Sequence, residues 1–78
     1  MDTKVKVKNV LADLLKVKID ELKDGVSLIN SIGVDSTEMV EAMIALEKAF
    51  SVKLSLKEIT KNSTINDIVS NIEQKIIK

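Results

Sequence analysis

The chain has 78 residues, and its 12 basic and 12 acidic side chains give a formal net charge of zero. This length predicts a single domain over residues 1–78 with a small core, because a short chain buries a smaller fraction of its surface. The chain has no cysteine and no histidine, which excludes a disulfide framework, a thiol nucleophile, a histidine general base and a zinc site built from these side chains. The neutral balance also argues against a dedicated nucleic-acid binder, which usually carries a basic excess.

Hydropathy predicts a soluble protein with an aliphatic core. No apolar run approaches the about 20 residues that a transmembrane helix needs, and the N-terminal segment lacks the apolar stretch of a signal peptide. We therefore expect a cytoplasmic protein that does not act at a membrane. Hydrophobic residues make up 45% of the chain but aromatic residues only 1%, so the core must consist of aliphatic side chains around the single Phe50.

The first predicted element is a helix over about residues 3–16. Its apolar residues Val7, Leu11 and Leu14 recur at three- and four-residue spacing, which places them on one face. A long connection follows, over about residues 17–35. It is rich in residues that favour turns, yet it also holds several apolar side chains, so we expect it to lie against the core. Within it, residues 19–22 are a candidate for one short helical turn.

The second main helix is predicted over residues 36–50. Its apolar stripe consists of Met39, Val40, Met43, Leu46 and Phe50. Either Asp35 or Ser36 suits the N-cap position, and acidic side chains in a first turn interact favourably with the helix dipole.

Two further helices are predicted after residue 50. A short one covers about residues 56–60, where Ser55 and Glu58 have the spacing of a capping box. The last covers about residues 65–77 and begins after Thr64, with isoleucines at helical spacing. The sum is an all-α fold, a small four-helix bundle with three main helices, one short helix and a long first loop.

The segment Gly33-Val34-Asp35-Ser36-Thr37 stands at the start of the second main helix and has two interpretations. In the simpler one it is a glycine turn followed by a polar cap. In the other, Ser36 is exposed at the positive end of the helix dipole, where a phosphate ester would be stabilised. Asp35 then either caps the helix or helps to hold a divalent cation that a modifying enzyme brings.

This segment and the helix after it resemble acyl carrier proteins. The resemblance includes the run of residues 32–36, the downstream run of residues 39–50 with its Leu46-Glu47-Lys48-Ala49-Phe50 ending, and the start of the last helix at residues 64–69. In that family a serine after an aspartate receives 4′-phosphopantetheine from coenzyme A. The resemblance extends over nearly the whole chain in length and in the order of elements.

The resemblance implies the function and the site. Ser36 would carry covalent phosphopantetheine, with Asp35 as its motif neighbour and Mg²⁺ needed only during attachment. The protein would not be an enzyme. It would be a substrate of a phosphopantetheinyl transferase and a monomeric carrier for acyl-processing synthases and transferases, in fatty-acid or polyketide-type biosynthesis. No nucleic-acid or membrane partner and no bound metal is expected.

The resemblance also implies two groups of surface and pocket residues. An acidic face would dock basic patches on partner enzymes, with Thr37 at a position that commonly contacts them; this docking group is Asp35, Thr37, Glu38, Glu41 and Glu47. Apolar side chains would shelter the acyl chain, although each also suits an ordinary core; these are Leu28, Leu46, Phe50, Leu54, Ile59, Ile68 and Ile72.

Several positions differ from the usual family pattern and favour a specialised carrier. Thr37 stands where leucine is usual, Asn62 stands where many relatives have an aliphatic residue, and the chain is neutral where fatty-acid carriers are strongly acidic. Two alternatives stay open from the sequence. One is a peptidyl or D-alanyl carrier of the same fold, and the other is a helical interaction domain that carries no prosthetic group.

Overall fold

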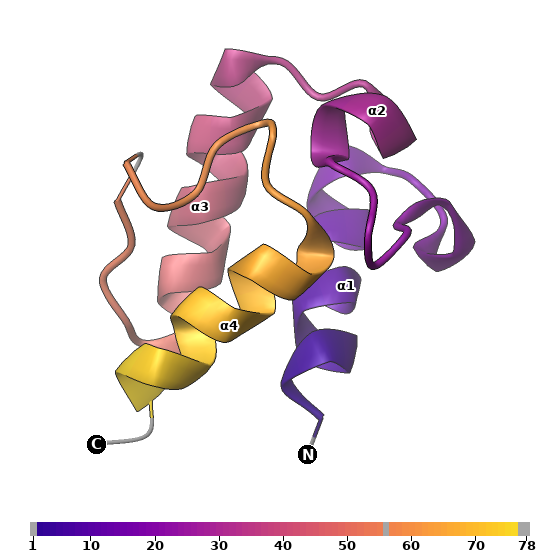
Figure 1. Cartoon of the computed structure of the whole chain (residues 1–78). Helices are drawn as coiled ribbons and strands as arrows, with labels where there is room; N and C mark the ends of the chain where they lie inside the picture. The colour runs from indigo at the N-terminus through magenta and orange to yellow at the C-terminus, as the bar shows by residue number, and fades with distance from the viewer. Residues whose placement is uncertain (1, 56, 77–78) are drawn as a thin grey trace.

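A computed structural model describes residues 2–55 and 57–76, and this part of the chain is helical (Figure 1). The elements are α1 (Thr3–Leu15), the 3-10 turn η1 (Ile19–Glu21), α2 (Leu28–Ile32), α3 (Ser36–Phe50) and α4 (Ile65–Ile76). The predicted all-α class is confirmed, with α1, α3 and α4 as the three main helices. Among the described residues no helix combines the length and the apolarity that crossing a membrane requires.

The core lies where α1 packs against both α3 and α4. It is aliphatic, as the composition predicts, because each helix turns its periodic apolar stripe inward. Fully buried side chains come from all three main helices and from the segments between them: Val7, Leu11, Leu22, Leu28, Leu46, Ile59, Ile65, Ile68 and Ile72. Phe50 is half-buried at the edge of this core, and the Lys6 ammonium lies 4.7 Å from the centre of its ring. This cation–π contact joins α1 to the end of α3.

The ends of the main helices follow local capping chemistry. The Asp2 side chain caps α1 by accepting from the Lys4 amide at 2.9 Å, and α1 ends one residue before the predicted Lys16, which adopts the left-handed conformation with φ 57°. The bounds of α3 are those predicted. At α4, Thr64 and Asp67 cap each other's amides at 3.1 Å, and the predicted last residue, Ile77, lies outside the described residues.

The prediction of a short helix over residues 56–60 is wrong in position. Leu56 lies outside the described residues, Lys57 and Glu58 form a turn, and Ile59 and Thr60 have no regular secondary structure. Ser55 Oγ accepts from the Lys57 amide at 3.0 Å, whereas the Glu58 carboxylate forms an ion pair with Lys75 at 3.2 Å instead of closing a capping box. The Thr60 amide donates to Ser63 Oγ, so it is not available for the backbone hydrogen bond that a helix would need at this residue.

The short helix of the bundle is α2, within the predicted long connection. Ser27 Oγ accepts from the Asn30 amide at 3.3 Å at its start, and Gly33 ends it with φ 68°, which glycine adopts without steric cost. The candidate turn at residues 19–22 is confirmed as η1. Backbone hydrogen bonds attach α2 to a distant loop, because the Leu28 and Ile29 amides donate to carbonyls of residues 63 and 61 at 3.0 and 2.9 Å.

Candidate functional site

Ser36 is the first residue of α3 and is exposed to solvent. The backbone that precedes it fixes this position. Gly33 turns the chain out of α2 in the left-handed conformation, and the side chain of Val34 is only 3% exposed, which anchors the connection to the core. The chain then emerges as the exposed pair of Asp35 and Ser36, so the sequence places the hydroxyl at the surface, at the start of a 15-residue helix.

Asp35, not Ser36, is the N-cap of α3, which decides between the two candidates from the sequence. Its Oδ1 accepts from the Glu38 amide at 2.7 Å, and the Glu38 carboxylate accepts from the Asp35 amide at 3.0 Å. The Ser36 hydroxyl is therefore not required for capping. It lies among the first amides of α3, where the partial positive charge of the helix terminus is concentrated.

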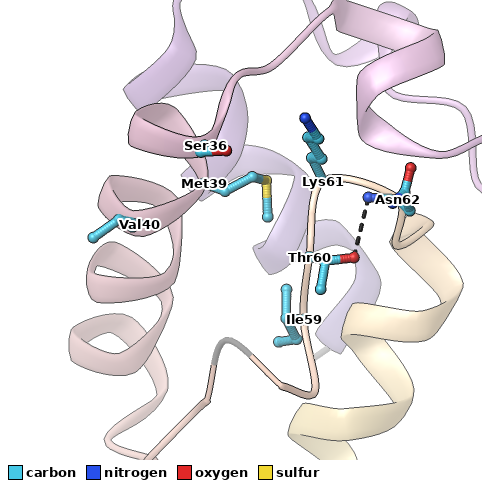
Figure 2. Close-up of a pocket in the computed structure, with 7 residues that line it drawn as sticks. All are labelled: Ser36, Met39, Val40, Ile59, Thr60, Lys61 and Asn62. Carbon is cyan, nitrogen blue, oxygen red and sulfur yellow. Dashed lines mark hydrogen bonds between the residues drawn. The ribbon is translucent and has the colours of Figure 1, made fainter.

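Ser36 opens onto a groove of about 270 Å³ between α3 and the segment 59–62 (Figure 2). On the α3 side, Ser36, Met39 and Val40 line it, and the opposite wall comes from Ile59, Thr60, Lys61 and Asn62. Figure 2 shows the Met39 side chain reaching from α3 toward the segment 59–62, on which Ile59 lies further from Ser36 than Lys61 does. The groove thus has the exposed Ser36 hydroxyl at its edge, apolar side chains (Met39 and Ile59) as its floor, and polar side chains (Thr60, Lys61 and Asn62) as its rim.

The polar rim is fixed by a hydrogen-bonded turn. The Ser63 hydroxyl accepts from the Thr60 amide at 3.0 Å, and the Thr60 hydroxyl accepts from the Asn62 amide at 3.2 Å. The Ser63 amide donates to the Thr60 carbonyl at 2.9 Å. Together with the two bonds from α2 to this turn, these contacts hold the wall of the groove opposite Ser36.

The predicted acyl-pocket residues lie mostly in the core behind the surface. Of the seven, Ile59 lines the groove; Phe50 is half-buried, and Leu28, Leu46, Leu54, Ile68 and Ile72 are buried core residues. Sequence reasoning did not assign to the pocket five residues that line the groove: Met39, Val40, Thr60, Lys61 and Asn62. The helical period marked Met39 as apolar, but no local pattern indicated that residues 60–62 would return to the start of α3.

The predicted docking residues do not share one environment. Asp35, Thr37 and Glu41 are exposed, whereas Glu38 is half-buried in the capping box. Glu47 is also half-buried, and its carboxylate accepts from the Leu54 amide at 2.8 Å, which fastens the chain after α3 to the helix.

Two exposed apolar side chains of α3 were not predicted as docking residues. Val40 is 39% exposed and Ile44 is 45% exposed, one helical turn apart. The helical period alone assigned Val40 to the buried stripe, and packing places it at the edge of that stripe instead.

Comparisons with known proteins identify the family of the chain. Residues 5–72 match the family model described as the phosphopantetheine attachment site. An acyl carrier protein of Clostridium acetobutylicum is 37% identical over 68 residues, which cover 87% of this chain and 88% of that protein. Acyl carrier proteins of Thermotoga maritima and Helicobacter hepaticus are 35% and 37% identical, over 91% and 94% of this chain and 88% and 96% of their own lengths. The chain belongs to the acyl carrier protein family, whose members carry phosphopantetheine covalently and interact with acyl-processing enzymes.

Proposed function

We propose that Ser36 carries 4′-phosphopantetheine and that residues 1–78 act as one carrier domain for acyl thioesters. The observation that supports this most directly is the exposed Ser36 hydroxyl at the start of α3, at the edge of the groove. The residues present fit the group, because the hydroxyl is accessible, the helix terminus favours an anionic ester, and the groove offers an apolar surface to the arm. Phosphopantetheine supplies a terminal thiol, which is the group that forms thioesters and which this cysteine-free chain lacks.

The attachment step is a phosphoryl transfer to the serine. Ser36 Oγ forms a bond to the phosphorus of coenzyme A that bears the pantetheine, as the phosphoanhydride bond breaks and adenosine 3′,5′-bisphosphate leaves. The hydroxyl proton passes to a base of the phosphopantetheinyl transferase, with Mg²⁺ as that enzyme's metal ion. The carrier itself then acts as a substrate and not as an enzyme.

Docking on partner enzymes is proposed for the surface of α3 around Ser36. Asp35, Glu38 and Glu41 place negative charge there, with Thr37 exposed among them. Complementary charge mainly accelerates and orients encounter, which suits a monomeric cytoplasmic carrier that must dock and dissociate many times. Glu47 contributes to the same charge from the half-buried position in which it also holds Leu54.

The cargo is proposed to be an acyl group of fatty-acid or polyketide-type synthesis. To shelter such a chain, the buried side chains of the predicted acyl pocket must part. A core built from aliphatic side chains offers few aromatic obstacles to this movement. Parallel loading reactions with an acyl-activating enzyme and an amino-acid-activating enzyme distinguish this cargo from that of a peptidyl or D-alanyl carrier.

Intact-mass measurement tests the attachment. Purified protein is incubated with a phosphopantetheinyl transferase, coenzyme A and Mg²⁺, beside a carrier known to be a substrate. The wild-type chain and Ser70→Ala, which changes an exposed serine of α4, should both gain the mass of one phosphopantetheine, whereas Ser36→Ala should gain none. An unmodified wild-type chain beside a fully modified control carrier, or equal modification of Ser36→Ala, contradicts the proposal.

A further inference from the structure

Lys61 is a basic side chain in the wall of the groove that Ser36 borders. It is half-buried, and Figure 2 shows its side chain extending along the groove with the ammonium at the end where Ser36 lies. Such a position lets the aliphatic stem cover apolar surface while the charged head stays in water. The groove therefore has a cation at its mouth.

The backbone of Lys61 is held in place from two directions. Its carbonyl accepts from the Ile29 amide of α2 at 2.9 Å. On both sides along the chain, the hydrogen bonds among Thr60, Asn62 and Ser63 close the turn. A lysine on a fixed backbone loses less freedom when its ammonium binds an anion, so its position is better suited to recognition than that of a lysine on a loose loop.

Negative charges are concentrated near Ser36, and a nearby cation would offset their repulsion. Asp35 and Glu38 are both within two residues of Ser36, and a phosphodiester adds a third negative charge beside them. Ion pairs within residues 2–55 and 57–76 use Lys4, Lys8 and Lys75, and none of them uses Lys61. Lys61 is the one ionisable cation among the described residues that line the groove.

We propose that Lys61 pairs with the phosphodiester that Ser36 bears and thereby draws the first part of the arm into the groove, against Met39 and Ile59. This inference rests on the proposed attachment at Ser36. Lys61 would favour one of two positions of the arm, the one in the groove over the one extended into solvent. Since an ammonium is a hydrated point charge and the pair is partly exposed, the effect is modest, about two- to fivefold in the ratio of the two positions.

Nuclear magnetic resonance of the phosphopantetheinylated protein tests the inference. The arm bears no cargo and ends in a free thiol, so a carboxylate on the cargo cannot be the partner of Lys61. Nuclear Overhauser contacts are measured from the two methyl groups of the arm's pantoyl unit to the labelled methyl groups of Met39 and Ile59, together with the ³¹P shift as salt is added. Lys61→Gln removes the cation, and Lys57→Gln is the matched control, because Lys57 is exposed in the same segment and does not line the groove.

The expected result is contact in the wild type and in Lys57→Gln, with a two- to fivefold lower intensity in Lys61→Gln. The ³¹P shift should respond to salt in the wild type and less so in Lys61→Gln. Equal contacts and equal salt response in both variants overturn the inference, as does an effect of the same size in Lys57→Gln. Methyl spectra of the unmodified variants check the fold, and intact mass is recorded first, so that a failure of attachment at Ser36 is separated from a failure of Lys61 to bind.

Discussion

The Asp35 and Glu38 carboxylates are each bound to the other's backbone amide, at 2.7 and 3.0 Å, on either side of Ser36. Both acidic side chains are thereby held at the first turn of α3, while the serine between them stays exposed. The same pair that gives the surface its negative charge also begins the helix. Changes at these positions therefore affect stability as well as the proposed docking, and the two effects have to be measured separately.

Loss of the N-cap should destabilise the protein. Asp35→Ala removes the acceptor of the Glu38 amide, and we expect the free energy of unfolding to fall by about 1 kcal/mol. Asp35→Asn keeps a side-chain oxygen and should lose less than half of that. Urea unfolding followed by circular dichroism measures both, with the exposed substitution Glu41→Gln as the control. An unchanged midpoint for Asp35→Ala would contradict the capping role.

The glycine before the site should be needed for its backbone conformation. Gly33 has φ 68°, and an alanine there costs about 1 kcal/mol because its Cβ crowds the following carbonyl. Gly25 also has open space around it but no positive φ is recorded for it, so Gly25→Ala should be neutral or stabilise by up to about 1 kcal/mol. Thermal unfolding compares the two variants. Equal changes in both would show that conformation at residue 33 is not limiting.

Periodic patterns predicted the elements that are long enough to display them. The bounds of α3 follow from a 15-residue amphipathic stretch with a polar cap. Helix α1 ends one residue before the predicted end, and α4 follows the prediction as far as the described residues extend. Five residues cannot show such a period, and α2 also contains Asn30 and Ser31, which favour turns. Its helix depends on hydrogen bonds to the turn around Lys61 and Ser63, which lie more than 30 residues away in the chain and leave no local signal.

Part of the candidate site was also predictable from local sequence, and part depends on tertiary packing. Ser36 and Asp35 are adjacent in the chain, and a helix start is recognisable from residue types, so the hydroxyl and its cap were predictable. The groove is formed by α3 and residues 59–62, whose approach depends on tertiary packing. Lys61 and Asn62 could therefore not be assigned to the site from the sequence alone.

Removing a core side chain from α4 should cost far more than removing an exposed one. Ile68 is 0% exposed, and Ile68→Ala should lower the free energy of unfolding by about 2–5 kcal/mol through lost burial and a residual cavity. Ile76 is 49% exposed on the same helix, so Ile76→Ala should cost less than about 1 kcal/mol. Urea unfolding measures both. Since a small domain is marginally stable, Ile68→Val, at about 0.5–1.5 kcal/mol, provides a milder variant if Ile68→Ala does not fold.

Asp24 should make the protein sensitive to acid. Its carboxylate binds the Lys8 and Lys4 ammonium groups of α1, and these hydrogen bonds lower the pKa of Asp24 below its ordinary value of 3.8. A lowered pKa in the folded state means that the stabilisation is complete above pH 3.8 and is lost as the pH falls through the folded-state pKa. Asp24→Asn should therefore reduce the loss of stability between neutral and acidic pH.

Thermal unfolding from pH 7 to pH 2.5 measures this dependence at low salt. The control is Asp20→Asn, in the exposed turn η1, which also removes one carboxylate but leaves both ion pairs of Asp24 in place. Added salt should lessen the difference between wild type and Asp24→Asn at neutral pH, because ions screen partly exposed pairs. Parallel profiles for wild type and Asp24→Asn at all pH values would show that the ion pairs with α1 do not contribute.

Charge reversal on the proposed docking surface should slow encounter with the transferase. Glu41 is exposed on α3, and within the described residues its side chain makes no hydrogen bond or ion pair, so Glu41→Lys changes charge with little effect on the fold. We expect the association rate constant to fall by on the order of tenfold at low ionic strength, since steering depends on complementary potentials. The difference should shrink as salt is added, because the Debye length falls.

Stopped-flow binding measures the rates. Glu73→Lys, an equal charge change at an exposed residue of α4, should have a much smaller effect. If both reversals slow association equally, the transferase senses net charge and not the α3 surface.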